Sequence, residues 1–83
     1  MNDVLMGIVV DVMAFFELSG EKVVNRKTAM AWLESLSYKL QKLSPADREA
    51  FLAFVRRRAE DEEKKPMKEF LQSLPEAAGL IEE

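Results

Sequence analysis

The sequence predicts an all-α protein, a compact bundle of about four helices with a short C-terminal turn, in a single domain spanning residues 1–83. Three observations predict this fold. Apolar residues recur at helical spacing in four segments. Capping residues and prolines separate these segments. A chain of 83 residues with 48% hydrophobic side chains also suffices for one core with a small stability margin.

An apolar first helix is expected from about Asp3 to Leu18. Adjacent apolar residues such as Val9 and Val10 break the period of two that a strand requires, and the polar positions recur at three and four. Apolar side chains cover roughly 200° of this helix, whereas a surface helix needs little more than about 100°. Either the other helices surround it, or another chain covers part of it. The second alternative predicts self-association as a homodimer through Val4, Ile8, Val12, Phe15 and Phe16.

The clearest boundary in the chain separates the second and third helices. Asn25 is a good N-cap for a second helix that ends near Leu43. Ser44 and Pro45 suit the cap and first position of a third helix, which continues to about Glu63. Such a short connection favours an antiparallel or sharply crossed pair of helices. The apolar stripe expected to face the core from the second helix is Ala29, Trp32, Leu33, Leu36, Leu40 and Leu43.

Prolines and a glycine organise the C-terminal segment. Pro66 starts a short fourth helix, Pro75 opens one more turn, and Gly79 closes it. We expect the final residues to divide between core and water, with Leu80 and Ile81 packed inward and Glu82 and Glu83 solvated.

The residue types point away from catalysis. The chain has no cysteine and no histidine, which excludes disulfides, thiolate metal sites and the commonest general base. Asp3 and Asp11 share one face of the first helix, and paired carboxylates can perform acid–base chemistry. We interpret them instead as part of a water-facing polar stripe formed by Asp3, Gly7, Asp11, Ala14 and Glu17. We therefore expect no enzyme activity, no cofactor and no bound metal.

The apolar N-terminal segment does not resemble a membrane or export signal. Val4 to Leu18 is shorter than the roughly 20 apolar residues of a membrane span, and Asp11 interrupts it. No basic residue precedes it, as a secretory signal would require. We expect a soluble, cytoplasmic protein with no membrane partner.

Charge is distributed unevenly along the chain. Residues 1–24 and 66–83 each carry a net −3, and residues 25–65 carry +3. The basic triplet Arg56–Arg58 precedes the acidic run Glu60–Glu63, so pairs four residues apart on a helix would neutralise the arginines. Because nucleic-acid affinity depends on uncompensated positive charge, nucleic acid is an unfavoured partner.

The acidic run has two interpretations. Acids near a helix C-terminus oppose the helix dipole, so local stability does not require them. They form either a solvated helix face or a patch for a partner with a basic surface. Tyr38 lies away from the apolar stripe of its helix, where it marks an interface or packs under the fourth helix. The candidate partner-binding residues are Glu60, Asp61, Glu62, Glu63 and Tyr38.

Capping and packing signals give the chain one resemblance. The stretch VNRKTAMAWLESLSYKLQKLSPADREAFLAFV, residues 24–55, resembles a loose class of small, uncharacterised bacterial helical proteins. The shared features are Leu33-Glu34, Leu40-Gln41, Ser44-Pro45 and Asp47-Arg48-Glu49, together with Leu74-Pro75-Glu76 and Gly79-Leu80 near the end. The resemblance implies an all-helical fold and no particular activity.

Three functions remain after these exclusions. The first is a non-catalytic protein-interaction module, in its most concrete form an immunity or antitoxin protein that covers the basic active site of a toxin. The second is a structural homo-oligomer or adaptor held together by the first helix. The third is a nucleic-acid-associated regulator, which the arginine triplet suggests.

Overall fold

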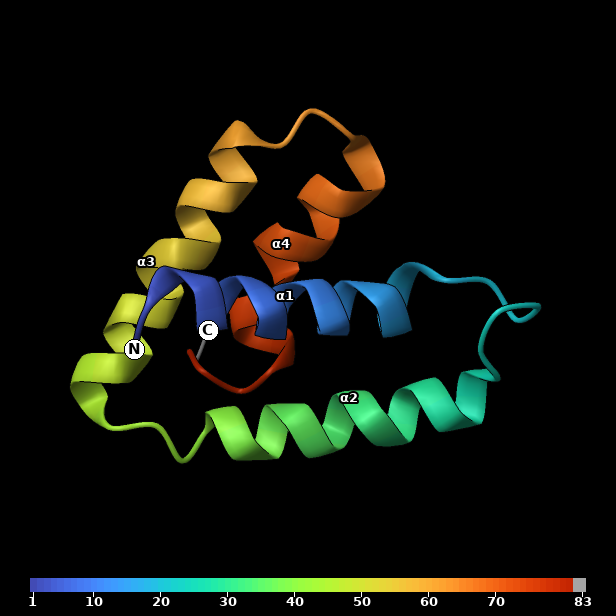
Figure 1. The fold of residues 1–83 in the computed structure, drawn as a ribbon, viewed down its shortest axis with the longest axis horizontal. Coiled ribbons are helices and arrows are strands. Elements are labelled where there is room, and N and C mark those ends of the chain that lie inside the picture. The colour runs from blue at the N-terminus through green and yellow to red at the C-terminus, as the bar shows by residue number, and fades with distance from the viewer. Residues whose placement is uncertain (82–83) are drawn as a thin grey trace.

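Four α-helices form the part of the chain, residues 1–81, that the computed structural model describes. They are α1 (Asp3–Leu18), α2 (Arg26–Leu40), α3 (Pro45–Asp61) and α4 (Lys65–Ala77). α1 crosses the middle of the molecule and contacts all three other helices, with α2 antiparallel to it and α3 and α4 forming a second hairpin (Figure 1). The all-α bundle predicted from periodicity is confirmed. Glu82 and Glu83, expected in water, lie outside the described residues.

Side-chain caps fix three helix starts close to where the sequence predicts them. The side-chain oxygens of Asn2 and Asn25 accept backbone N–H bonds at the starts of α1 and α2, and the Ser44 hydroxyl accepts from Asp47 N at 3.2 Å. α2 ends three residues before the expected Leu43, because the chain turns there and Leu43 N donates to Leu40 O. α3 ends at Asp61 rather than Glu63.

The end of α4 differs from the prediction at Pro75. This residue does not open a new turn but is buried inside the helix. The helix closes through a Schellman motif, in which Leu80 N donates to Pro75 O at 2.9 Å and Gly79 N to Glu76 O at 3.0 Å. Gly79 has a φ of +73°, so its predicted role as the stop is confirmed.

The core lies where α1, α3 and α4 meet. Its fully buried side chains are Phe51, Leu71, Leu74, Val10 and Val55, and within residues 1–81 no polar or charged side chain is buried. Leu80 packs inward as expected, whereas Ile81 is 41% exposed. Trp32, expected inward on α2, is 51% exposed with its ring stacked on Phe16, because α2 contributes few residues to the core.

Candidate functional site

α1 has two apolar faces, and the fold covers only one of them. Met6, Val10, Met13 and Ala14 are buried against the other helices. At about 100° per residue, Val4, Leu5, Ile8, Val12 and Phe15 lie on the opposite side of the helix. Their exposed fractions run from 40% at Val12 to 73% at Val4. We call these five residues the α1 seam.

The α1 seam has the spacing of a helix–helix contact. Leu5, Ile8, Val12 and Phe15 follow one another at intervals of three, four and three residues, which are the a and d positions of a heptad. The seam therefore brings together four of the five side chains that the sequence predicts for self-association: Val4, Ile8, Val12 and Phe15. Leu5 extends the group, and its position in the heptad is the sequence signal that identifies it.

Phe16, the fifth residue named for self-association, lies at one edge of the seam. It is partly buried, its ring meets Phe15 edge-on at 5.6 Å between centroids, and it stacks on Trp32 at 5.9 Å. It therefore joins α1 to α2 and borders the seam rather than belonging to it.

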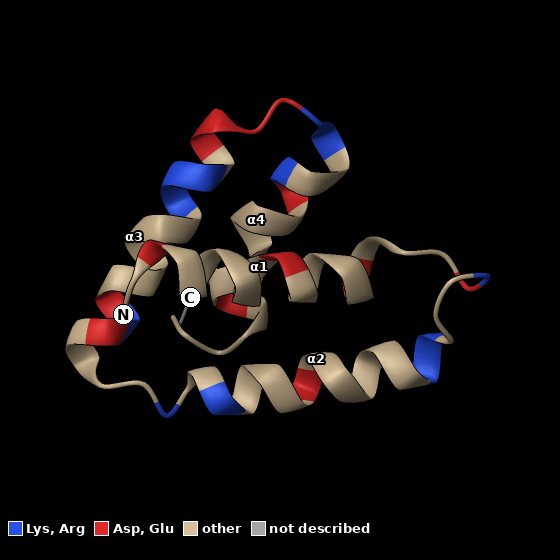
Figure 2. Ribbon diagram, in the orientation of Figure 1, with Lys and Arg blue, Asp and Glu red and all other residues tan. Residues whose placement is uncertain are grey.

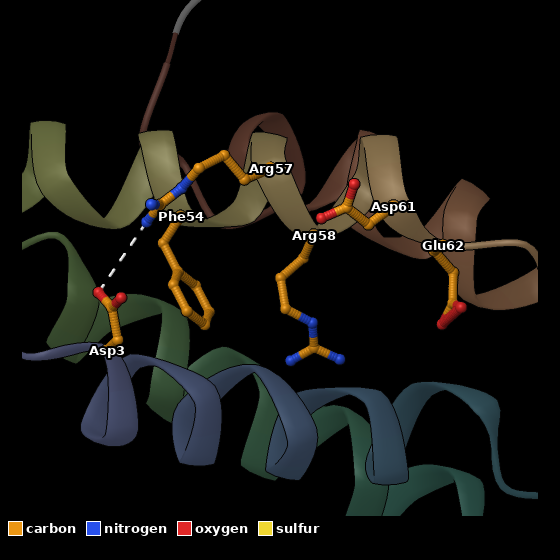
Figure 3. A pocket seen from close by; sticks show the side chains of 6 residues that line it. All are labelled: Asp3, Phe54, Arg57, Arg58, Asp61 and Glu62. Carbon is orange, nitrogen blue, oxygen red and sulfur yellow. Dashed lines mark ion pairs between the residues drawn. The ribbon is translucent and has the colours of Figure 1, made fainter.

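Two ion pairs form the other edge of the seam. Arg57 reaches Asp3 at 3.9 Å, and Arg58 donates to Asp11 Oδ1 at 3.1 Å. Figure 3 shows Arg57 extending to Asp3 and the Arg58 guanidinium lying over α1. The expected pairing of Arg57 and Arg58 with acids four residues later on α3 is therefore wrong.

The polar stripe predicted on α1 faces water in part: the Asp3 and Asp11 side chains are 71% and 66% exposed, whereas the middle of the stripe is covered. Ala14 is buried, and a Cβ atom at Gly7 would lie 3.7 Å from the Phe54 ring of α3. This contact between α1 and α3 accompanies the two ion pairs that join Asp3 and Asp11 to the α3 arginines. The two carboxylates act as ion-pair partners between helices.

The four acids at the end of α3 do not gather on one face. Asp61 and Glu62 line a cleft of about 360 Å³ beside α1, whereas Glu60 faces a second cleft with Lys68. Glu62 Oε2 also accepts from the backbone N–H of Glu63 at 3.1 Å. Within residues 1–81 none of the four carboxylates forms an ion pair. Figure 2 shows this acidic segment between basic segments of α3 and α4.

Tyr38 belongs to α2, and Figure 1 shows α2 on the opposite side of the molecule from the end of α3. Tyr38 is 62% exposed, so it does not pack under α4, and Lys42 Nζ lies 4.5 Å from its ring centroid. Together with residues of α1, α2 and α4 it lines a groove that the sequence did not reveal. The proposed partner-binding residues therefore fall on two separate surfaces.

Three further findings bear on the function of the protein. Within residues 1–81, no three acidic side chains converge on a position where they could hold a metal ion. None of the helices in this range combines the length and apolar character needed to cross a bilayer. Comparison of the chain with protein families, curated proteins and solved structures finds no match.

Proposed function

We propose that this chain is a non-catalytic protein-interaction module that forms a homodimer through the α1 seam. The observation that carries this proposal is the exposure of five large apolar side chains on the side of α1 opposite the core. A monomer gains nothing from leaving them in water. Covering them removes apolar surface from solvent, which is the main driving force of protein association.

The area of the seam suits a second copy of the chain. Five side chains, each about half exposed, amount to a patch on the order of 500 Å², near the upper limit for monomeric proteins. Two copies would together bury about 1,000 Å², the lower bound of specific interfaces. We therefore expect a weak, reversible dimer.

The chemistry of the seam also suits self-association. A two-fold contact places the same patch on both sides, so the patch must not repel itself. The seam contains no charged residue, and the edge beside α3 balances Asp3 and Asp11 with Arg57 and Arg58. Two copies can approach without an unpaired charge becoming buried.

Sedimentation equilibrium of wild type and two matched variants tests the dimer. Ile8→Glu places a charge in the seam, where the wild-type side chain is 54% exposed, so folding tolerates it. Val23→Glu makes the same change in the α1–α2 loop, at 65% exposure and outside the seam. We expect wild type and Val23→Glu to dimerise and Ile8→Glu to remain monomeric. A monomeric wild type, or a dimeric Ile8→Glu, would contradict the proposal.

A second candidate function is binding of a basic partner, of the immunity or antitoxin kind, at the end of α3. One observation favours it: Arg57 and Arg58 turn to α1, which leaves the Glu60–Glu63 carboxylates without ion-pair partners within residues 1–81. Replacing Glu60, Asp61 and Glu63 by Lys should slow association with such a partner, most strongly at low salt. An unchanged association rate would leave these acids as a solvated helix end.

A further inference from the structure

A groove of about 920 Å³ runs between α2 and α4, on a surface separate from the α1 seam. Both helices pack on α1 or its neighbours, but they have little contact with each other. α1 supplies part of the floor through Met13 and Leu18. At one end the walls are joined, because Gln41 Nε2 donates to Ala78 O at 2.9 Å.

The groove is long enough to accommodate a short helix. Its lining on α4 extends from Pro66 to Ala78, which corresponds to about 18 Å at a rise of about 1.5 Å per residue.

The lining is apolar at its base and acidic at its edges. Met13, Leu33, Phe70 and Leu74 provide the base, with Met30, 40% exposed, at the α2 side. Methionine side chains adapt to irregular apolar partners.

The charges at the edges favour a basic occupant. Glu17, Glu34 and Glu69 contribute three negative charges, and the basic side chain in the lining, Arg26, lies 3.8 Å from Glu17. Glu69 on α4 also pairs with Lys65 at 3.9 Å, but both side chains of this pair are largely exposed, so the pair screens the Glu69 charge only weakly. Glu34 on α2 and Glu69 on α4 thus place an acidic side chain on each wall.

We propose that this groove binds an amphipathic helix of another protein, with apolar residues at i, i+3, i+4 and i+7 and with Lys or Arg along both edges. The apolar face of the bound helix would cover the base of the groove, including Leu33 and Phe70. Its basic edges would face Glu34 and Glu69. Tyr38, exposed beside the groove, would extend the contact. The inference does not rest on dimerisation, because the seam and the groove use different faces of α1.

Binding of a designed peptide tests the groove. The probe is a labelled peptide of about 14 residues made of Leu, Ala and Lys in this pattern, compared with a peptide in which Glu replaces Lys and with a shuffled peptide. Fluorescence anisotropy should give at least about tenfold tighter binding for the Lys peptide. Equal binding of the Lys and Glu peptides, or no binding of the Lys peptide, would overturn the proposal.

Two variants of α2 locate the binding site. Met30→Lys adds a positive charge inside the groove, and Ala31→Lys adds the same charge at an exposed position of the same helix outside it. Met30→Lys should weaken binding of the Lys peptide about tenfold or more relative to Ala31→Lys, with unchanged circular dichroism in both. Equal affinities would show that the peptide binds elsewhere. Ile8→Glu should bind the peptide as wild type does, whereas loss of binding would place the peptide on the seam and refute the groove.

Discussion

Replacing Gly79 by Ala should destabilise the protein by about 2–3 kcal/mol. Gly79 has a φ of +73°, and a residue with a Cβ atom in this left-handed conformation costs about 1–2 kcal/mol. The new Cβ would also lie 2.6 Å from Gln41 Nε2. The Gln41 side chain must then move and give up its 2.9 Å bond to Ala78 O, which contributes about 1 kcal/mol.

Urea denaturation followed by circular dichroism measures this loss directly. Gly20→Ala is the matched control, because no atom lies within 4 Å of its added Cβ and its φ is not positive. It should be neutral or slightly stabilising, by about 0.5 kcal/mol.

A double-mutant cycle separates the two contributions. In a Gln41→Ala background the clash disappears, so Gly79→Ala should cost about 1 kcal/mol less than in wild type. Equal midpoints for Gly79→Ala and Gly20→Ala would refute the reasoning about the closing turn of α4.

Three other substitutions have expected stabilities that urea denaturation can check. Leu40→Ala should lower the free energy of unfolding by about 2–4 kcal/mol because Leu40 is 5% exposed. Leu36→Ala should lower it by about 1–2 kcal/mol because Leu36 is only partly buried. Equal losses in the two variants would contradict this ranking. Asn25→Ala removes the cap of α2 and should cost about 1 kcal/mol, whereas an unchanged midpoint would mean that the cap is dispensable. Arg58→Ala should cost less than about 1 kcal/mol, since its partner Asp11 is 66% exposed, and this cost should fall as salt rises.

Local signals in the sequence predict the helices well. The caps at Asn25 and Ser44 and the stop at Gly79 act within one helical turn, so the residues that decide them are neighbours in the chain. Pro75 is the exception, because its place inside α4 depends on burial against the core. A proline signal alone does not distinguish a new turn from a helix whose packing tolerates it.

The partners of charged side chains were harder to predict. Arg58 has acids four residues later on its own helix, yet it pairs with Asp11, which is 47 residues away in sequence. The sequence does not give the crossing of α1 and α3 that makes this pair possible. The exposure of Trp32 and the groove between α2 and α4 escape prediction for a similar reason. The apolar stripe on α2 does not reveal how far α2 lies from α4.

The central position of α1 has a consequence for synthesis on the ribosome. α1 emerges first, but the side chains of α4 that complete its core, Phe70, Leu71 and Leu74, emerge about 60 residues later. Until then the part of the α1 core face that α4 covers stays open, although α2 and α3 already contact α1. A nascent chain stalled before α4 would therefore expose part of the α1 core face in addition to the α1 seam, and at this stage it would be most prone to chaperone capture or aggregation.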